Sequence, residues 1–384
     1  MKLLVITPCV GRNASGFVFE KIIRELSQYN EIDVLTYDYA PLNNMDQVHE
    51  VIVCEKKYIH PRIVKGLISL FHANPIDFIW TQNAKKNLKD KNKSYDLVFS
   101  FLHSHQYTPL IAGIDLSSHF NSKLAVYAID ALPPRGWEEN KLYFRAVEKI
   151  MHKYLSKADA LFSSNEIMLE YQLNLLKTNK KIMNGVIYTP AIIDHFTYLP
   201  EKKDPNNNFV FTGGIYGVRK VNYLLEGFEK LLLEFPESNL IFVGSTIDSS
   251  LLKNYKSETL EKVKIYPFTK DLFPYYESAT ALIDIDADIE NDLFLSSKIV
   301  NYLKVDRIII SETGNNSPSR LLFKDINSII QCHHNSEELY SAMKSTILRN
   351  TEIKYDDRAS VSDLFSLPKI VQKLNKFINE LIIS

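Results

Sequence analysis

Two glycines and two adjacent cations stand between an apolar run and an amphipathic segment in the second half of the chain. The stretch FVFTGGIYGVRKVNYLLEGFEKLL begins at Phe209 and contains Gly213, Gly214, Arg219 and Lys220. Glycines let a backbone approach a ligand closely, and arginine can hold phosphate oxygens with two parallel hydrogen bonds. The stretch therefore predicts a phosphate-binding turn between a strand and a helix. The alternative is a plain turn that carries a solvated basic pair.

Two later stretches add anion-binding residues to the same half of the chain. NLIFVGS ends an apolar run close to Gly244, and SSKIVNYL begins an amphipathic segment with Ser296, Ser297 and Lys298. Amides at a helix start, together with a lysine, can hold a diphosphate. Serine is also a preferred N-cap residue and needs no ligand in that role. Because parallel strands share one carboxyl edge, we expect these residues to gather beside Gly213.

An acidic run, DIDADIEND, spans 284–292 between these stretches. Alternate aspartates on a strand share one face, and carboxylates are ligands that magnesium and manganese prefer. A polar loop beside a bound sugar would have the same composition. Glu290 lies in this run and is a candidate ligand-binding residue.

The first half of the chain offers three candidate catalytic residues. His103 and His105 follow an apolar run in FSFLHSHQY, and Asp130 follows another in LAVYAIDALPPRGW. Polar side chains directly after buried parallel strands lie where α/β folds bind ligands. The alternative for each of them is a structural cap of the turn that follows the strand.

Short apolar runs alternate with longer amphipathic ones throughout, which is typical of parallel α/β architecture. Helical periodicity is clear at 16–29, 142–157, from 219 onward, and at 368–383, and the polar segment 198–208 is the best linker. The expected strands are 2–7, 31–37, 95–101, 124–130, 160–164, 209–212, 240–243, 264–266, 281–286, 307–311 and 328–331.

Composition limits the possible classes of protein. The chain has 384 residues, 45% of them hydrophobic, and a formal net charge of −1, which gives no overall field for nucleic acid. Three cysteines without metal-ligand spacing suit a reducing, cytoplasmic setting. No apolar run approaches the roughly 18 residues of a membrane span. The start MKLLVITPCV is interpreted as a first buried strand rather than a signal peptide.

Several of these motifs together resemble the GT-B glycosyltransferases, in particular the retaining group 1 (family 4-like) enzymes. SSKIVNYL resembles a donor-site helix of that family, YLSKADALFSSNEIM the end of its first domain, and VRKVNYLLEGFEKL the helix after its phosphate turn. The resemblance implies an α/β protein with two Rossmann-like, doubly wound domains that face each other across a cleft. It places an acceptor domain at 1–199 and a donor domain at 200–367, with the helix at 368–384 returning to the first.

The resemblance also assigns roles to residues. It implies that Arg219 and the Ser296–Lys298 stretch hold the diphosphate, that Asp130 contacts the sugar, and that no metal or other cofactor is needed. The sequence departs from the family at its two glutamates, which are here Leu293 and Asn301. It departs also at Gly214, where the family has arginine, and Arg219 takes the place of a lysine. Asn301 can still hydrogen-bond a ribose hydroxyl, more weakly than a carboxylate would.

The expected function is transfer of a sugar from a UDP- or GDP-sugar to a glycan, lipid-linked or small-molecule acceptor, in bacterial surface polysaccharide or glycoconjugate synthesis. Two alternatives remain: a nucleotide-sugar 2-epimerase on the same fold, and a non-catalytic nucleotide-sugar-binding scaffold. The basic stretch 83–96 and the amphipathic segment before it raise the possibility of peripheral contact with the inner face of a membrane.

Overall fold

The computed structural model describes the whole chain except residues 90–92, 104–105, 177–179, 203–204, 350–354 and 384. The chain divides into two compact units, and each is described by itself. The first comprises Met1–Pro190 and Leu367–Ser384, and the second comprises Ala191–Ser366.

The division after Pro190 comes earlier than the 199/200 boundary that the linker composition suggested. Three backbone amides explain the difference, because Ile192, Thr197 and Leu199 donate hydrogen bonds to residues of the second unit. Their acceptors are the Asn301 side chain, the Lys304 carbonyl and the Asp306 carboxylate. The segment 191–199 therefore belongs to the second unit by its hydrogen bonds, whatever its composition.

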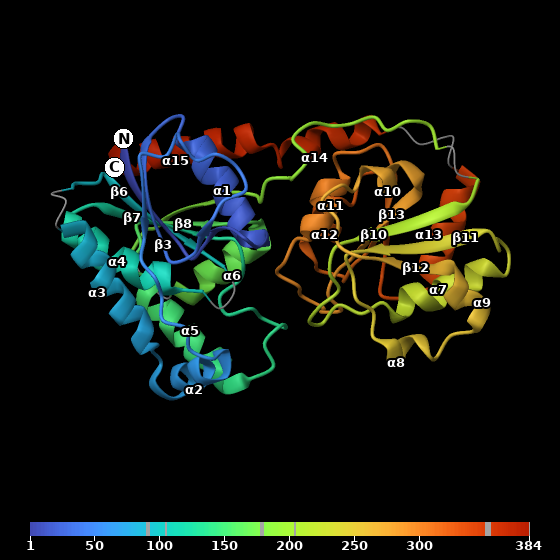
Figure 1. The fold of residues 1–384 in the computed structure, drawn as a ribbon, viewed down its shortest axis with the longest axis horizontal. Helices are drawn as coiled ribbons and strands as arrows, with labels where there is room; N and C mark the ends of the chain where they lie inside the picture. The colour runs from blue at the N-terminus through green and yellow to red at the C-terminus, as the bar shows by residue number, and fades with distance from the viewer. Residues whose placement is uncertain (90–92, 104–105, 177–179, 203–204, 350–354, 384) are drawn as a thin grey trace. The chain divides into compact units, whose positions relative to one another are not determined.

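The first unit is built on a seven-stranded parallel sheet in the order β5-β3-β1-β6-β7-β8-β9. Helices lie on either side of its strands (Figure 1). The strands are β1 Lys2–Thr7, β3 Glu31–Thr36, β5 Glu50–Val53, β6 Leu97–Leu102, β7 Lys123–Ala128, β8 Ala160–Ser163 and β9 Met183–Val186, with the small pair β2 Val10–Gly11 and β4 Tyr39–Ala40. The helices are α1 Ala14–Leu26, α2 Pro61–Phe71, α3 Pro75–Lys89, α4 Thr108–Phe120, α5 Lys141–Leu155, α6 Glu166–Leu176 and α15 Leu367–Ile383.

The second unit repeats the design with a six-stranded parallel sheet in the order β12-β11-β10-β13-β14-β15. Its strands are β10 Asn207–Thr212, β11 Ser238–Val243, β12 Val263–Tyr266, β13 Ala279–Ile285, β14 Ile308–Glu312 and β15 Ile329–Cys332. Its helices are α7 Asn222–Leu232, α8 Ser249–Leu252, α9 Ser257–Lys262, α10 Phe273–Ser278, α11 Ser297–Tyr302, α12 Pro318–Leu322, α13 Ser336–Arg349, the 3-10 turn η1 Asp356–Arg358 and α14 Ala359–Asp363. The strand order reverses direction between β10 and β13, and this switch point is where doubly wound sheets bind ligands.

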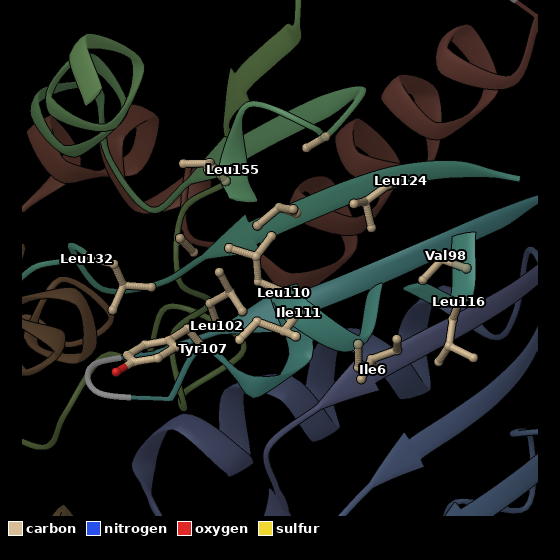
Figure 2. Close-up of a cluster of buried hydrophobic side chains, with 14 of the residues drawn as sticks. Ile6, Val98, Leu102, Tyr107, Leu110, Ile111, Leu116, Leu124, Leu132 and Leu155 are labelled. Carbon is tan, nitrogen blue, oxygen red and sulfur yellow. The ribbon is translucent and has the colours of Figure 1, made fainter. Parts of the chain in front are cut away.

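The core of each unit explains why the strands read as continuous apolar runs. Every residue of β6, β11 and β13 is buried, because helices cover both faces of a parallel sheet. Figure 2 shows part of the core of the first unit, where Leu110, Ile111 and Leu116 of α4 lie among side chains of β1, β6 and β7. The central strands of both sheets are therefore enclosed, and their carboxyl ends are the places left for chemistry.

Each of the expected strands forms. The two-residue pair β2 and β4 was not expected, and neither were β5 and β9 of the seven-stranded sheet. Both are four-residue strands at the edges of their sheet, where few neighbours demand an apolar pattern. One helix start was wrong, because α7 begins at Asn222 rather than at Arg219. The residues 213–221 instead form a loop, so Arg219 is held by a loop and not by a helical turn.

The C-terminal helix α15 packs on elements of the first unit. Its Phe377 ring lies 5.2 Å from Phe162 of β8, and a Cβ added to Gly185 of β9 would come within 2.7 Å of that same ring. Asn375 accepts a hydrogen bond of 2.9 Å from Asn30. The apolar stripe of the helix, which includes the fully buried Leu374, completes the first unit although it lies at the other end of the sequence.

Replacing Leu374 by alanine is expected to destabilise the first unit by about 2–5 kcal/mol, because it leaves a cavity under α15. Both tryptophans of the chain, Trp80 and Trp137, lie in the first unit, so tryptophan fluorescence during urea unfolding reports on that unit. The exposed neighbour change Lys373→Ala is the control. An unchanged fluorescence midpoint in Leu374→Ala would mean that α15 does not support the first unit.

Candidate functional site

The carboxyl ends of β10 and β13 bring together the polar residues of the second unit. Gly213 directly follows β10 and has a φ of +94°, a conformation that favours glycine. A Cβ at this position would lie 3.0 Å from Cε of Lys298. The lysine side chain therefore lies across the first glycine of the pair, and a larger residue there would push it aside.

Lys298 presents its ammonium group at this edge of the sheet. The Nζ atom lies 5.2 Å from the centre of the Phe211 ring, and none of the described residues forms an ion pair with it. Burial and the nearby Arg219 together lower the pKa of Lys298 to about 8, while Asp284 and Asp286 oppose this shift. An ammonium that is partly desolvated and lacks a close counterion is well prepared to bind an anionic ligand.

Arg219 is the second cation of the site and is only 8% exposed. Its guanidinium lies 5.2 Å from the centre of the Tyr216 ring. Burial opposes its charge, but Tyr216 and the carboxylates of Asp286 and Asp284 outweigh burial and raise the pKa of Arg219. Its neighbour Lys220 is exposed, so only one of the two adjacent cations in the sequence enters the site.

Two fully buried carboxylates, Asp284 and Asp286, lie at the end of β13 beside these cations. The Ser296 hydroxyl donates to Oδ1 of Asp284 at 2.6 Å, and Thr313 and Ser317 donate to Oδ2 of Asp286 at 3.1 and 3.2 Å. The other oxygen of each carboxylate is buried without a hydrogen-bond partner among the described residues. Burial, reinforced by the neighbouring Asp286, raises the pKa of Asp284 to about 7, and burial also raises the pKa of Asp286.

The acidic run was expected either to bind a metal or to form a polar loop beside the sugar, and the sequence did not predict that Asp284 and Asp286 would join the two cations. The two acids occupy one face of the otherwise apolar stretch IDIDA at the end of a strand. A buried strand tolerates such acids only where cations or donors are brought to them from other elements. That alternation therefore marks a charged cluster at the strand end.

The helix α11 and its N-cap supply Ser296, Ser297, Lys298 and Asn301. Of these four residues, Lys298 brings a positive charge to the cluster. Ser296 is the N-cap, because its side chain accepts from the amide of Lys298 while donating to Asp284. Asn301 accepts from the Ile192 amide at 2.7 Å and donates to the Ser297 carbonyl at 2.9 Å. Ser297 itself is exposed. The side chains of Ser296 and Asn301 thus already have partners within the unit.

The remaining expected residues of this half lie around the cluster. Gly214 contacts the Tyr216 ring, since a Cβ there would be 3.4 Å from its Cδ1. Gly244 follows β11 with a φ of +77° and lies against Phe268. The side chain of Glu290 is exposed in the loop before α11. The structure therefore joins Gly213, Arg219 and Lys298 with the two aspartates and leaves Lys220 and Glu290 on the surface.

The expected catalytic residues belong to the first unit. His103 follows β6, forms an isolated bridge with Gln106 and lies with its ring 6.2 Å from that of Phe19. Asp130 follows β7, is partly buried, and its carbonyl accepts from Gln172 at 3.3 Å. His105 lies outside the described residues. Both described residues stand at carboxyl ends of strands, where the sequence placed them.

A buried polar network in the first unit was not expected from the sequence. Lys56 donates to Asp77 at 2.7 Å, Thr108 donates to the same oxygen at 2.6 Å, and the lysine lies 5.0 Å from the centre of the Tyr37 ring. These residues come from four separate segments, so no local sequence motif predicts the network. The network lies on segments that follow β3 and β5 and at the first residue of α4.

The described residues include neither a metal-binding group of side chains nor a membrane-spanning helix. No group of three or more His, Cys, Asp or Glu side chains in the described part of the chain has an arrangement suited to a metal ion. No helix in the same residues is long and apolar enough to cross a membrane.

Comparison with solved structures identifies the fold. The chain matches a structure of Anabaena Alr3699/HepE in complex with UDP over 99% of its own length and 100% of that chain, with a TM-score of 0.69 and 12% identity. It matches a glycosyltransferase from Rickettsia africae over 99% and 98%, with a TM-score of 0.65 and 13% identity. The chain has the GT-B glycosyltransferase fold.

A third solved structure that matches this chain is named as an epimerase and not as a glycosyltransferase. A putative UDP-N-acetylglucosamine 2-epimerase from Listeria monocytogenes matches with a TM-score of 0.55 and 10% identity, over 97% of this chain and 94% of the other. No protein-family model matches the sequence. The search of curated proteins gives no significant match either. At these identities the likeness establishes the GT-B fold, and the activity has to be argued from the site.

Arg219→Ala is expected to weaken binding of a nucleoside diphosphate, UDP or GDP, by about 10- to 100-fold, because a buried charge-assisted contact is lost. Binding of the bare nucleoside should change little. Lys220→Ala is the matched control, since it removes an adjacent but exposed cation. Calorimetry of both ligands makes the comparison. Equal losses for diphosphate and nucleoside would assign Arg219 a structural role only.

Proposed function

We propose that the protein is a glycosyltransferase that moves a sugar from a UDP-sugar donor to a hydroxyl of an acceptor. The observation that carries the proposal is the pair of cations at the switch point of the second sheet, where Lys298 lies against Gly213 and Arg219 lies near Asp284 and Asp286. A UDP-bound GT-B structure of the same length as this chain supports the choice of UDP over GDP.

The second unit binds the donor in this proposal. Gly213 keeps the loop after β10 close to the ligand, and α7 begins without a side-chain cap, so that its first amides remain for an anion. Arg219 and Lys298 stabilise the negative charge that develops on the departing diphosphate as the bond to the sugar breaks. This electrostatic role is worth more in a partly desolvated site than in water.

The first unit binds the acceptor, and Asp130 is the residue that acts on the reacting sugar or the incoming hydroxyl. Its place after β7 is the carboxyl edge of a parallel sheet, where loops carry the chemistry of such folds. His103 stands in the equivalent place after the neighbouring β6 and is the second candidate. Asn301 holds the chain in place through its hydrogen bonds with the Ile192 amide and the Ser297 carbonyl.

The stereochemistry, the metal requirement and the acceptor class in this proposal follow from the resemblance of the sequence motifs to the group 1 enzymes. The transfer retains the anomeric configuration and needs no metal, and the acceptor is a glycan or a lipid-linked molecule in the synthesis of a bacterial surface polysaccharide or glycoconjugate. A nucleotide-sugar 2-epimerase is the second candidate, because one such putative enzyme shares the fold along nearly all of this chain. A non-catalytic nucleotide-sugar-binding scaffold is the third.

Incubation with UDP-sugars separates these three functions. A transferase is expected to release UDP and free sugar slowly when water replaces the acceptor, an epimerase to yield the epimeric UDP-sugar, and a scaffold to bind without any product. Asp130→Asn should lower the release rate by about 10²–10³ and leave donor affinity unchanged, since its contact forms mainly in the transition state. Wild-type turnover in this variant would move the assignment to His103.

We also propose that the first unit contacts an anionic membrane through α2. Only Ile68 of this helix is buried, while Ile63, Leu70 and Phe71 are 57%, 74% and 67% exposed. Arg62 of the same helix and Lys57 just before it are exposed cations that suit anionic headgroups. The lysine-rich stretch 83–96 contributes less than expected, because Lys85 pairs with Asp115 and Lys93 pairs with Asp33 and Glu50.

Co-sedimentation with phosphatidylglycerol-containing vesicles tests this contact. The double change Leu70→Ser and Phe71→Ser is expected to reduce the bound fraction severalfold, because apolar area available for insertion is lost. Leu233→Ser, which alters an 80% exposed apolar residue of the second unit, should have no effect. Equal vesicle binding by wild type and the double variant would exclude α2 as the contact.

A further inference from the structure

The charge of the donor site is balanced before any ligand arrives. Arg219 and Lys298 carry two positive charges when protonated, and Asp284 and Asp286 carry two negative charges when ionised. Both carboxylates are fully buried, and each has one oxygen without a hydrogen-bond partner among the described residues. The four groups therefore form a cluster whose charges cancel when all four are ionised, and its carboxylates are incompletely satisfied.

A diphosphate that binds to the two cations disturbs this balance. The diphosphate of a nucleotide-sugar carries about two negative charges at neutral pH, because each phosphate has one ester bond, one anhydride bond and a single acidic hydroxyl that does not titrate there. Binding it would leave a buried cluster with a charge of about −2 if the carboxylates stayed ionised. Buried uncompensated charge is costly, and a carboxylate relieves that cost by taking up a proton.

We propose that Asp284 and Asp286 take up a proton when the nucleotide-sugar binds, so that the pair sets the charge state in which the site accepts its donor. This inference rests on the proposed function, because it requires a diphosphate on Arg219 and Lys298. Asp284 is the expected principal site of uptake. Only the Ser296 hydroxyl among the described residues donates to it, whereas Asp286 accepts from two hydroxyls.

The electrostatics of the free site favour this uptake near neutral pH. Burial and the neighbouring Asp286 raise the pKa of Asp284 to about 7, so the carboxyl is already half protonated there and loses its proton above that pH. An added anion raises this pKa further. Donor affinity is then greatest below pH 7 and falls as the pH rises through the pKa of the free site, by up to about tenfold per pH unit for one proton.

Other charged groups face the two aspartates from the surrounding elements, and proton uptake by these groups has to be distinguished from uptake by the aspartates. The titratable ones are Arg219, Lys298, Tyr302, Glu312, Asp288 and His334. Arginine and tyrosine keep their protons throughout this pH range. Glu312 and His334 are hydrogen-bonded to each other at 2.9 Å, so a proton is shared within that pair. Lys298, with its pKa of about 8, is about 90% protonated at pH 7 and can take up little more there.

Calorimetry of UDP-glucose binding in buffers of different ionisation enthalpy, near pH 7, measures the uptake directly. The slope of the observed enthalpy against buffer ionisation enthalpy gives the number of protons bound, and we expect about half a proton per UDP-glucose. Asp284→Asn keeps the oxygen that accepts from Ser296, cannot ionise, and should abolish most of the uptake. The exposed change Asp325→Asn, in the same unit, is the control.

The same variant gives a second and opposite readout at higher pH. Asn at position 284 resembles the protonated aspartate, so Asp284→Asn should bind UDP-glucose several times more tightly than wild type near pH 7.5, where Lys298 is still mostly protonated. The pH dependence of its binding between pH 6 and pH 7.5 should also be flatter. A purely structural role would predict weaker binding at every pH. UDP-glucose binding without proton uptake in the wild type would overturn this inference alone. Absence of UDP-glucose binding at every pH would overturn the proposed function and this inference with it.

Discussion

The close approach of Lys298 to Gly213 is the contact on which the arrangement of the site depends. It requires a glycine with positive φ after β10, a lysine at the second residue of α11, and a sheet that places β10 beside β13. A side chain at Gly213 would collide with the lysine. Because the right-handed crossover from β12 returns the chain to the far side of β10, two segments about 80 residues apart meet at one edge.

Two buried carboxylates give this edge its electrostatic character. Asp284 and Asp286 keep two cations at a sheet end that would otherwise be apolar, and they do so without close ion pairs to Lys298. A tight salt bridge would have satisfied the lysine and removed its attraction for an anion. Hydroxyls of Ser296, Thr313 and Ser317 hold the carboxylates instead.

Structural residues fix the frame around this cluster. Asn301 joins α11 to the segment at Ile192, and Arg358 is fully buried with hydrogen bonds to carbonyls at the end of α11 and at the starts of β14 and β15. Burial lowers the pKa of Arg358 to about 10, which still leaves it charged at neutral pH. The helix that carries Lys298 is thereby held at its C-terminal end, opposite the end at which Lys298 lies.

The sequence by itself determined the fold class, the central strands and the motifs at their ends, because buried parallel strands and amphipathic helices leave strong local periodicity. It also singled out Gly213, Arg219 and Lys298 by residue type and by their places after strands or at a helix start. Only the tertiary structure decided that Lys220 and Glu290 face solvent. It also decided that Asn301 hydrogen-bonds to Ile192 and Ser297, and that Asp284 and Asp286 lie inside the cluster. Those outcomes depend on which distant segments fill the space around a side chain, and local sequence carries no record of that.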